Sequence, residues 1–532
     1  MQIPSASQAC SIKIDHTDFE RQFAQKSCRI TKMWPNENMG PLFELKVTTA
    51  PKGSRDVASH LFRQLKQAIL DHRLPPGARL PSTRAARHVF GVSRNTAQDV
   101  YDRLLQEGLT SARHGSGTYV RVIASAAAVR PEPSPAIIAE PGNDIWDRAD
   151  ITSWIGFWHE KGHPGALPPI VADLRPALVD QSLFPHATFR RAMARQLRKL
   201  ETAPVPSRSP QRNQGNFHLR RAIVEHIGLT RAVPCRPDDV LVTAGAQQAF
   251  DLIARTLVVP GKTVVAVEDP GYPPLRVPFA AAGARIVPVR VDAEGLVVDE
   301  IPIDATIICV CPSHQFPLGM SLSPRRREAL LVLARRTGAA IVEDDYDGEF
   351  RYGGSPLEAL RSDASADRVF YVGSFSKCML PAIRLGFLVA PPWAMPALIA
   401  AKNASDWHCS SPIQMAVGEF IRDGHLTRHI RRVRRTYLER RDHLVDLIER
   451  RVGDALKVVP SHYGMHMSAI AERGINCELV STALAERGVM VHSLERYHLG
   501  PAERSGFVIG YATADLNSLE VAIGAMAEEI RR

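Results

Sequence analysis

Hydrophobic residues recur at two different spacings along the chain, and the change of spacing separates two regions. Between residues 56 and 105, apolar positions recur every three or four residues, which predicts short helices with one buried face. Further along, apolar and β-branched residues form continuous runs, at residues 262–267, 305–310, 339–342, 369–372 and 385–389. A helical pattern at residues 325–336 separates two of these runs. Continuous apolar strands with intervening helices predict an α/β region whose sheet is covered on both faces.

The first region has the pattern of three helices. Four apolar residues lie four apart on the face of the first helix, at Val57, Leu61, Leu65 and Ile69. Ser82 and Ser93 are expected to cap the second and third helices, because a serine hydroxyl accepts hydrogen bonds from the free amides of a first turn. We expect Val89 of the second helix and Leu105 of the third to face inward.

The third helix and the segment after it have the chemistry of a DNA-binding element. The first turn leaves Arg94, Asn95 and Thr96 projecting, which is where a recognition helix contacts base edges. Residues 110–120 read as two short strands around a turn of small residues, which predicts a β-hairpin wing that approaches phosphates. Residues 51–121 hold 12 Lys/Arg against 5 Asp/Glu in a chain of net charge +10. An anionic partner is expected here, although the charge alone fits a solvated helix face equally well.

Polar residues in the second region gather where its predicted strands end. Asp344 follows the run at 339–342, and Lys377 follows the run at 369–372. Ligands of α/β sheets bind beyond the carboxyl ends of the strands. A lysine can form a Schiff base with an aldehyde cofactor, and a carboxylate can keep the pyridine nitrogen of that cofactor protonated. Although a Ser-x-Ser-Lys turn alone is usually a solvated loop, the two residues together predict a pyridoxal phosphate site.

Further residues support this interpretation. Gly245 precedes a predicted helix whose first backbone amides suit a phosphate dianion, which is weak evidence by itself. Tyr272 and His314 follow two other predicted strands. One pocket can therefore collect residues from several strand ends.

The motifs of the first region closely resemble the winged helix-turn-helix of GntR-type bacterial repressors. They are Leu80-Pro81-Ser82-Thr83-Arg84, Val92-Ser93-Arg94-Asn95-Thr96, Tyr101-Asp102-Arg103-Leu104, Glu107-Gly108 and Gly115-Ser116-Gly117-Thr118-Tyr119-Val120. The DNA-binding residues that this resemblance implies are Arg84, Ser93, Arg94, Asn95, Thr96, His114, Gly115, Ser116 and Gly117.

The second region resembles fold-type I aminotransferases, and together with the first it looks like the MocR-type branch of GntR regulators. The motifs lie at residues 243–248, 268–272, 312–319, 343–352 and 373–377. By this resemblance Lys377 forms the Schiff base, Asp344 pairs with the pyridinium and Tyr346 bonds to the ring hydroxyl. The remaining cofactor-binding residues it implies are Gly245, Ala246, Gln247, Tyr272, His314, Ser374, Ser376 and Arg384.

Two departures from aminotransferases proper concern the cofactor. Phe316 stands where an Asn-Pro-x-Gly turn usually has its asparagine, so the contact to the ring hydroxyl is expected to pass to Tyr346 or His314. In aminotransferases a tyrosine of the second subunit often binds the phosphate, but residues 201–217 of this chain contain no tyrosine. Cofactor affinity is therefore expected to be lower than in the enzymes. For an effector carboxylate, Arg496 is the candidate.

The resemblance implies a regulator and not an enzyme. The protein is expected to be a homodimer that binds double-stranded operator DNA and senses an amine or amino-acid-like effector through aldimine exchange at Lys377. The alternative is an active aminotransferase that carries a DNA-binding head. The two differ in turnover, because an enzyme must accept a second keto acid and cycle, whereas a regulator can stop at a half-reaction.

The sequence also sets expectations for domains and location. Residues 1–50 are an extension without a motif, 51–121 the winged head, 122–165 a linker rich in Ala and Pro, and 166–532 the aminotransferase-like body. In the body we expect a large subdomain at about 205–410, and a small one formed by 411–532 with the segment before 205. No apolar stretch approaches the roughly 20 residues that span a bilayer, so a cytoplasmic location is expected. The eight cysteines are scattered, which indicates neither disulfides nor a metal site.

Overall fold

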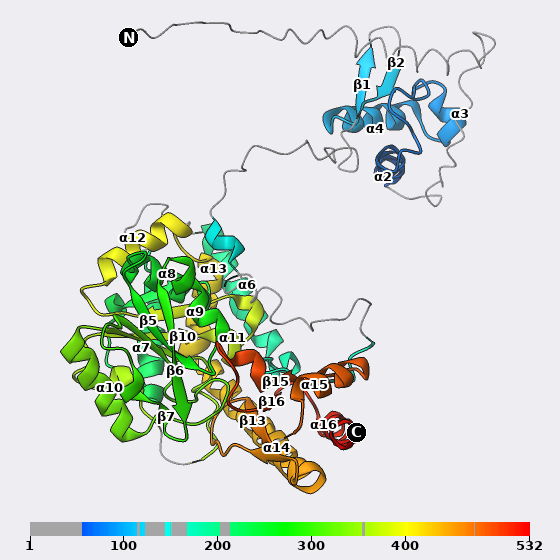
Figure 1. Ribbon diagram of the computed structural model, residues 1–532. Coiled ribbons are helices and arrows are strands. Elements are labelled where there is room, and N and C mark those ends of the chain that lie inside the picture. The colour runs from blue at the N-terminus through cyan, green and yellow to red at the C-terminus, as the bar shows by residue number, and fades with distance from the viewer. Residues whose placement is uncertain are drawn as a thin grey trace, which may run out of the picture. The chain divides into compact units, whose positions relative to one another are not determined.

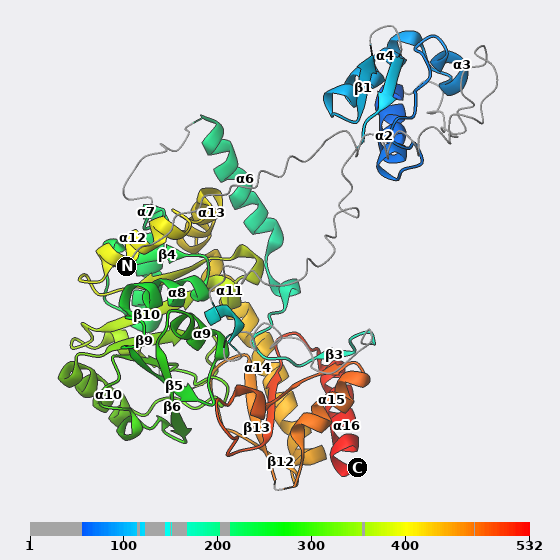
Figure 2. The same ribbon diagram turned by 45° about the horizontal axis from the view of Figure 1, so that its top comes forward.

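Residues 1–140 and residues 141–532 form separate units of the chain (Figures 1 and 2). The computed structural model describes residues 56–113, 117–122, 144–148, 151, 168–202, 213–353, 357–472 and 474–532. We call the described residues 56–122 the head and those from 144 onward the body. The expected extension at 1–50 and most of the expected linker lie outside the described residues.

The head is a three-helix unit with a hairpin. Its elements are α2 (Val57–Leu70), α3 (Ala86–Phe90), α4 (Arg94–Gln106), β1 (Thr110–Arg113) and β2 (Gly117–Val120). The two strands pair antiparallel, with Thr110 opposite Val120. Ser93 caps α4 as predicted, because its hydroxyl oxygen accepts a hydrogen bond of 3.1 Å from the Thr96 amide. The architecture is that of a winged helix-turn-helix.

Two side chains of the head do not face the core as the sequence predicted. Val89 is 40% exposed and Leu105 is 44% exposed, whereas their neighbours Phe90 and Leu104 are buried. Successive residues on a helix point about 100° apart, so only one of each apolar pair can enter a core this small. Ser82 accepts a hydrogen bond from the Ala85 amide, one residue before α3 itself begins.

An eight-stranded sheet lies at the centre of the body. Its order is β4-β11-β10-β9-β8-β5-β6-β7. The strands are β4 (Val240–Thr243), β5 (Val264–Asp269), β6 (Arg285–Asp292), β7 (Gly295–Leu296), β8 (Ile307–Val310), β9 (Ala340–Asp345), β10 (Val369–Ser374) and β11 (Gly386–Val389). The pairs β10–β9, β9–β8, β8–β5 and β5–β6 are parallel, whereas β11 is antiparallel to both of its neighbours. The carboxyl ends of the parallel strands therefore share one edge of the sheet.

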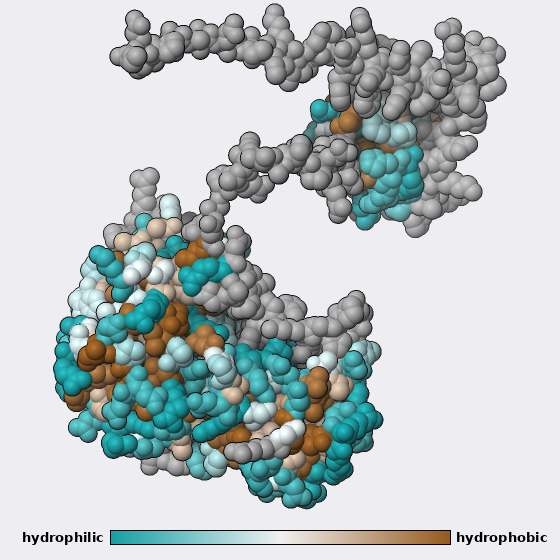
Figure 3. All heavy atoms as spheres, viewed as in Figure 1, coloured by the Kyte–Doolittle hydropathy of each residue, from teal (hydrophilic) through white to brown (hydrophobic). Residues whose placement is uncertain are grey.

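Helices cover both faces of this sheet (Figure 1), which confirms the predicted α/β arrangement. On one face Val265 packs in a core with α8 (Ala246–Leu257), α9 (Pro273–Ala281) and α12 (Met395–Ser405). On the other face Ala266 packs with α10 (Pro324–Thr337). The outer surface over α10 is largely hydrophilic in Figure 3, as expected for a helix that buries one face only.

The C-terminal part of the body contains a second sheet. It is antiparallel and has the order β12-β13-β16-β15, formed by β12 (Leu456–Val458), β13 (His466–Ala471), β16 (Gly506–Gly510) and β15 (His492–Ser493). The remaining α-helices of four residues or more in the described ranges are α6 (His186–Thr202), α7 (Phe217–Arg231), α11 (Phe375–Cys378), α13 (Ser411–Arg422), α14 (His425–Val452), α15 (Cys477–Glu486) and α16 (Leu516–Arg531). The short strand β3 (Ala172–Asp173) pairs parallel with β14 (Val489–Met490), so the segment before α6 joins this C-terminal part. No helix in the described ranges is long and apolar enough to span a membrane.

Candidate functional site

A cavity of about 330 Å³ lies where β9 and β10 end. Many of the predicted cofactor-binding residues line it, namely Ala246, Gln247, Tyr272, Asp344, Tyr346, Ser374, Ser376, Lys377 and Arg384. The other lining residues, which the sequence did not assign to cofactor binding, are Ala177, Phe250, Pro274, Phe316 and Pro381. The structure therefore collects residues from α8, from the loops after β5, β8 and β9, and from α11 around one space.

Lys377 lies in α11 directly after β10, and its side chain enters the cavity. Its ammonium group donates a hydrogen bond to the carbonyl oxygen of Ala177. Burial lowers the pKa of Lys377 to about 8, while the nearby carboxylates of Asp347 and Asp344 oppose this shift. With a pKa of about 8, roughly a tenth of the amine is neutral at pH 7, far more than for an ordinary lysine. The neutral amine is the nucleophilic form.

Asp344 is buried at the end of β9, and one of its oxygens has no partner. It is 3% exposed, and no described residue donates a hydrogen bond to its Oδ1 atom. Burial raises the pKa of Asp344 well above its usual value. A buried carboxylate oxygen without a donor costs free energy, so the geometry suits a ligand that brings a donor or a positive charge. The protonated nitrogen of a pyridine ring is such a group.

The start of α8 and Arg384 form a cradle for an anion. Gly245, with φ of +85°, precedes α8, and a Cβ atom there would lie 3.3 Å from the Nη2 atom of Arg384. Arg384 donates from Nη2 to the carbonyl of Ala244 at 3.1 Å, which holds the guanidinium beside the helix start. The free amides of the first turn and the positive helix end favour a phosphate at this place. Ser374 and Ser376 add hydroxyl groups to the same cavity.

Gln247 and Tyr272 lie on the cavity wall in different roles. The side-chain amide of Gln247 donates to the carbonyl oxygen of Pro274 at 3.0 Å, which ties the start of α8 to α9. The ring of Tyr272 packs edge-on against Phe316, with ring centroids 5.3 Å apart and planes at 76°. Two aromatic rings thus form one apolar wall of the cavity.

His314 lies behind Tyr346 and is not among the described residues that line the cavity. Its Nδ1 atom is 2.8 Å from the Tyr346 hydroxyl oxygen and 2.9 Å from Oδ2 of Asp347. Of the two candidates for the contact to a ring hydroxyl, Tyr346 lines the cavity, and His314 lies next to its hydroxyl group. The sequence analysis missed Asp347, although it stands within the motif at 343–352.

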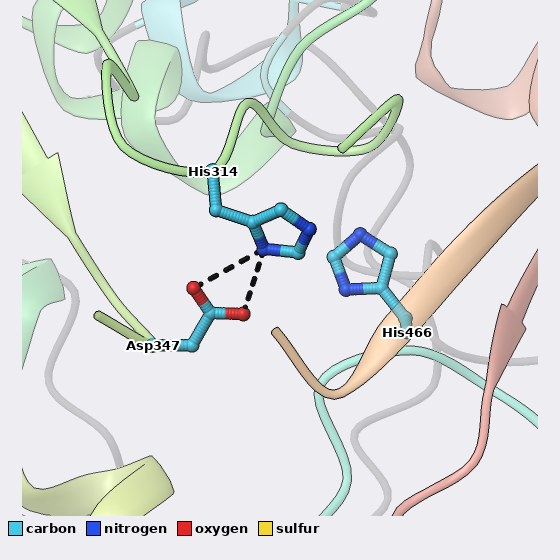
Figure 4. Close-up of side chains that lie close together, drawn as sticks. All are labelled: His314, Asp347 and His466. Carbon is cyan, nitrogen blue, oxygen red and sulfur yellow. Dashed lines mark hydrogen bonds and ion pairs between the residues drawn. The ribbon is translucent and has the colours of Figure 1, made fainter. Parts of the chain in front are cut away.

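His314, Asp347 and His466 bring three metal-binding side chains together (Figure 4). One ligand atom from each lies within 4.8 Å of the others, and all three residues are buried. Both carboxylate oxygens of Asp347 already contact His314, and Nε2 of His466 lies 3.1 Å from the carbonyl oxygen of Pro317. Asp347 and His314 thus form a hydrogen-bonded pair that meets the Tyr346 hydroxyl, whereas the hydrogen bond of His466 goes to a different segment. The expectation of no metal stays a prediction.

Arg496, the candidate for an effector carboxylate, lies on the 3-10 helix η9 (Leu494–Tyr497). It does not appear among the described residues that line the cavity. Its positive charge contributes to lowering the pKa of His492, after the larger effect of burial, which places it near β15. The structure gives no support to this assignment.

The predicted DNA-reading residues lie at the start of α4. Arg94 and Asn95 are exposed there, and Arg84 is exposed in the turn before α3. The Thr96 hydroxyl is 2.8 Å from that of Ser93, so these two side chains take part in the helix cap. The exposed side chains of this turn that are not used in the cap are therefore Arg94 and Asn95.

The hairpin adds basic residues that the sequence analysis did not single out. A Cβ atom at Gly117, where φ is +117°, would lie 3.0 Å from Nε of Arg79, so glycine lets this arginine lie against the start of β2. The guanidinium of Arg113 lies 5.0 Å from the ring centre of Tyr119. His114, Gly115 and Ser116 lie outside the described residues.

Comparison with known families agrees with this two-part architecture. Residues 57–120 match the family described as bacterial regulatory proteins, gntR family, and residues 181–526 match aminotransferase class I and II. The fold and the site thus define a winged helix-turn-helix regulator built on an aminotransferase-like body. The chain belongs to the MocR-type branch of the GntR family.

The relatives support this family assignment. The probable rhizopine catabolism regulatory protein MocR of Rhizobium meliloti is 32% identical over 474 residues, covering 88% of this chain and 93% of that protein. The pyridoxine biosynthesis transcriptional regulator PdxR of Corynebacterium glutamicum is 29% identical and covers 92% of this chain and 99% of its own. These relatives are named as regulators, and together with the matched gntR-family region they support a DNA-binding transcriptional regulator.

Solved structures show the same body fold. The kynurenine aminotransferase of Pyrococcus horikoshii has a TM-score of 0.63 at 24% identity, covering 68% of this chain and 91% of its own. The alpha-aminoadipate aminotransferase LysN of Thermus thermophilus has a TM-score of 0.61 at 27% identity, covering 68% and 92%. The structure of LysN is a complex with a phosphopyridoxyl-leucine compound.

Proposed function

We propose that this regulator binds pyridoxal 5'-phosphate in the cavity of Lys377 and responds to an amine or amino-acid-like effector there. The observation that carries the proposal is the meeting of Lys377 with the unpartnered Oδ1 atom of buried Asp344 in one cavity. A dimer scaffold without a cofactor has no need for an uncompensated buried carboxylate. The aminotransferase-like body of the family supports the choice of cofactor.

Each residue of the cavity has a task in this proposal. Bound pyridoxal 5'-phosphate supplies an aldehyde that condenses reversibly with amines and a pyridine ring that acts as an electron sink. Lys377 offers its amine from the end of α11, and Asp344 accepts the hydrogen bond of the protonated ring nitrogen. Arg384 and the first turn of α8 hold the phosphate. Tyr272 and Phe316 limit the tilt of the ring and exclude water from one side.

The effector acts by competing with Lys377 for the aldehyde group of the cofactor. An amine that took the place of Lys377 would leave its side chain free to donate to the carbonyl oxygen of Ala177, the contact that the structure shows. Such a change alters DNA binding only if the effector binds one arrangement of the body more tightly than the other. The head binds operator DNA through Arg94 and Asn95 of α4 and through the hairpin.

We further propose that the protein acts as a homodimer. Two copies of the head would then contact two half-sites of an operator, arranged as a direct or inverted repeat. Binding through both heads raises the overall affinity above that of either head alone.

The test follows the visible spectrum and the DNA footprint of one preparation. The protein loaded with pyridoxal 5'-phosphate is expected to be yellow, and a panel of amines is added to find one that shifts its absorbance. That amine is expected to change the footprint or the affinity for DNA without sustained product release. Lys377→Ala serves as the control, because it removes the amine that forms the coloured bond. Multiple turnover at about 1 per second or faster, with no effect of the amine on DNA, would favour an active aminotransferase instead.

A further inference from the structure

His314 presents its Nδ1 atom to two oxygens at once. Oδ2 of Asp347 lies 2.9 Å from this nitrogen, Oδ1 lies 3.2 Å away, and the Tyr346 hydroxyl oxygen lies 2.8 Å away. His314 and Asp347 each have a side-chain exposure of only 1%. One ring nitrogen carries either a proton or a lone pair, so the two contacts cannot be assigned independently.

The other ring nitrogen shows which form is present. Nε2 of His314 is buried and has no hydrogen-bond partner in the described part of the chain. It faces glycine, because a Cβ atom at Gly319 would lie 3.3 Å from it. With the proton on Nε2, this N–H would be buried without an acceptor, and the lone pair of Nδ1 would face the carboxylate oxygens of Asp347. The structure therefore favours a proton on Nδ1 of His314, where the carboxylate of Asp347 accepts the hydrogen bond.

The placement of that proton decides the direction of the Tyr346 hydroxyl. With a proton on Nδ1, His314 cannot accept a hydrogen bond from Tyr346 there, so the tyrosine oxygen faces the N–H as an acceptor. The hydrogen of the Tyr346 hydroxyl must then point elsewhere, and Tyr346 lines the cavity. The ring of His314 has little freedom to turn, because a Cβ atom at Gly464 would lie only 2.0 Å from its Cε1 atom.

Neighbouring groups keep Tyr346 in its donor form. Burial raises the pKa of Tyr346 well above its usual value, and the charges of Asp347, Cys311, Asp344 and Glu268 act in the same direction. His466 packs against the same rings, 4.9 Å from His314 between centroids. Burial lowers the pKa of His466 well below its usual value, and its Nε2 atom faces the Pro317 carbonyl, so it does not compete for Nδ1 of His314.

We propose that His314, held by Asp347, is a positioning residue that turns the hydroxyl hydrogen of Tyr346 into the cavity, toward the ring oxygen of the cofactor. This inference rests on the proposed cofactor site. Phe316 stands in the turn after β8, where an asparagine side chain would have supplied a second hydrogen-bond donor to the ring oxygen. The Asp347–His314 pair acts on the donor that remains, the Tyr346 hydroxyl. Tyr346 then depends on His314 for its orientation.

The test measures the pH midpoint of the visible absorbance change of the cofactor-loaded protein. A hydrogen-bond donor to the ring oxygen of the cofactor lowers the affinity of that oxygen for the proton it shares with the neighbouring nitrogen. Loss of the donor is therefore expected to raise the pH midpoint of the absorbance change. His314→Phe keeps a ring but removes the N–H, and it is expected to raise the midpoint by about one pH unit. Tyr346→Phe is expected to raise it by the same amount. His314→Asn restores a donor near the Nδ1 position and is expected to stay near the wild-type midpoint.

Two controls separate positioning from packing. His466→Phe changes an equally buried ring of the same cluster and is expected to leave the midpoint unchanged. In a Tyr346→Phe background, His314→Phe is expected to add no further shift, because its effect acts through the missing hydroxyl. Equal shifts of His314→Phe in both backgrounds, or no shift at all, would overturn the proposal.

A measurement on the unsubstituted protein covers the case in which His314→Phe does not fold. In the apoprotein labelled with ¹⁵N-histidine, the ring resonances of His314 are expected to show a protonated Nδ1 and a bare Nε2. Assignment uses the His314→Asn variant, which lacks these signals. A proton on Nε2 would refute the inference whether or not the cofactor binds. A protein that never turns yellow but shows a protonated Nδ1 would refute the cofactor proposal and leave the orientation of Tyr346 standing.

Discussion

Replacing Asp344 by asparagine is expected to stabilise the apoprotein while it weakens cofactor binding. Asp344 is 3% exposed and its Oδ1 atom has no donor among the described residues, so its charge is buried without full compensation. An unsatisfied buried polar group costs about 1–3 kcal/mol, and a charged group lies at the upper end. Asparagine keeps the size of the side chain and removes the charge. The free energy of unfolding of the apoprotein is therefore expected to rise by about 1–3 kcal/mol at pH 8.

The gain in the free energy of unfolding of Asp344→Asn is expected to increase with pH. Burial raises the pKa of Asp344 in the folded state above that of an unfolded aspartate, about 3.9. A carboxyl with a raised pKa favours folding fully below the unfolded pKa, and this contribution is lost as pH rises toward the folded pKa. The advantage of Asp344→Asn is therefore expected to be small near pH 4 and to grow toward pH 8.

Asp345→Asn is the matched control, because it makes the same change at the next residue. Asp345 is paired with Arg231, whose Nε atom lies 2.6 Å from Oδ2, and it also accepts a hydrogen bond of 2.5 Å from Tyr371. Both side chains of this ion pair are almost fully buried. Removing one partner of a buried pair leaves an uncompensated charge and costs about 3–5 kcal/mol. Asp345→Asn is therefore expected to destabilise the protein.

The assay compares urea and thermal unfolding of the two apo variants with wild type at pH 4.5 and pH 8. The same variants are titrated with pyridoxal 5'-phosphate by absorbance. Loss of a charge-assisted hydrogen bond to the ring nitrogen is expected to weaken affinity about 10- to 100-fold in Asp344→Asn. If Asp344→Asn instead destabilises the apoprotein as much as Asp345→Asn does, Asp344 is a structural carboxylate, and the reasoning that assigns it to the cofactor is refuted.

The remaining predictions concern the lysine, the head and the assembly. Lys377→Ala is expected to abolish the visible band and to keep the wild-type circular dichroism, and a band that persists would remove Lys377 from the site. Arg94→Ala is expected to weaken specific DNA binding by about 1–3 kcal/mol and to leave the cofactor spectrum intact, as measured by fluorescence anisotropy at fixed salt. Arg255→Ala, which removes an exposed arginine of α8 in the body, is the control and is expected to bind DNA normally. The protein is expected to sediment as a dimer and to protect two half-sites, and a monomer that protects one would contradict the proposed assembly.

Much of the fold and site of the body could be predicted from the sequence, because the functional residues directly follow the predicted strands. The apolar runs at 339–342 and 369–372 became β9 and β10, and these strands are parallel neighbours. Residues that follow parallel strands lie at the same edge of the sheet. The sequence alone could therefore predict that Asp344 and Lys377 lie close together. The head was predictable for a similar reason, because a serine cap and helical spacing are local signals.

Contacts between distant segments were not predictable in this way. Ala177 lines the cavity and accepts a hydrogen bond from Lys377, yet it stands 200 residues earlier in a loop before α6, with no motif around it. His466 of the second sheet packs against His314, although it stands far later in the chain. Periodicity fixes which face of an element is buried, but it does not say which element will cover that face.

The two adjacent aspartates of β9 have different roles that the structure, and not the sequence pattern, distinguishes. The letters Asp344-Asp345 do not say which residue serves a ligand, since either could be the counter-charge of a pyridinium. Successive side chains of a strand point to opposite faces of the sheet. In β9 this sends Asp345 toward Arg231 of α7, where it is neutralised, and leaves Asp344 on the cavity side with an unpartnered oxygen. One carboxylate therefore stabilises the fold, while the other keeps a buried oxygen atom that a ligand can satisfy. Its presence in the strand costs stability unless the site is used.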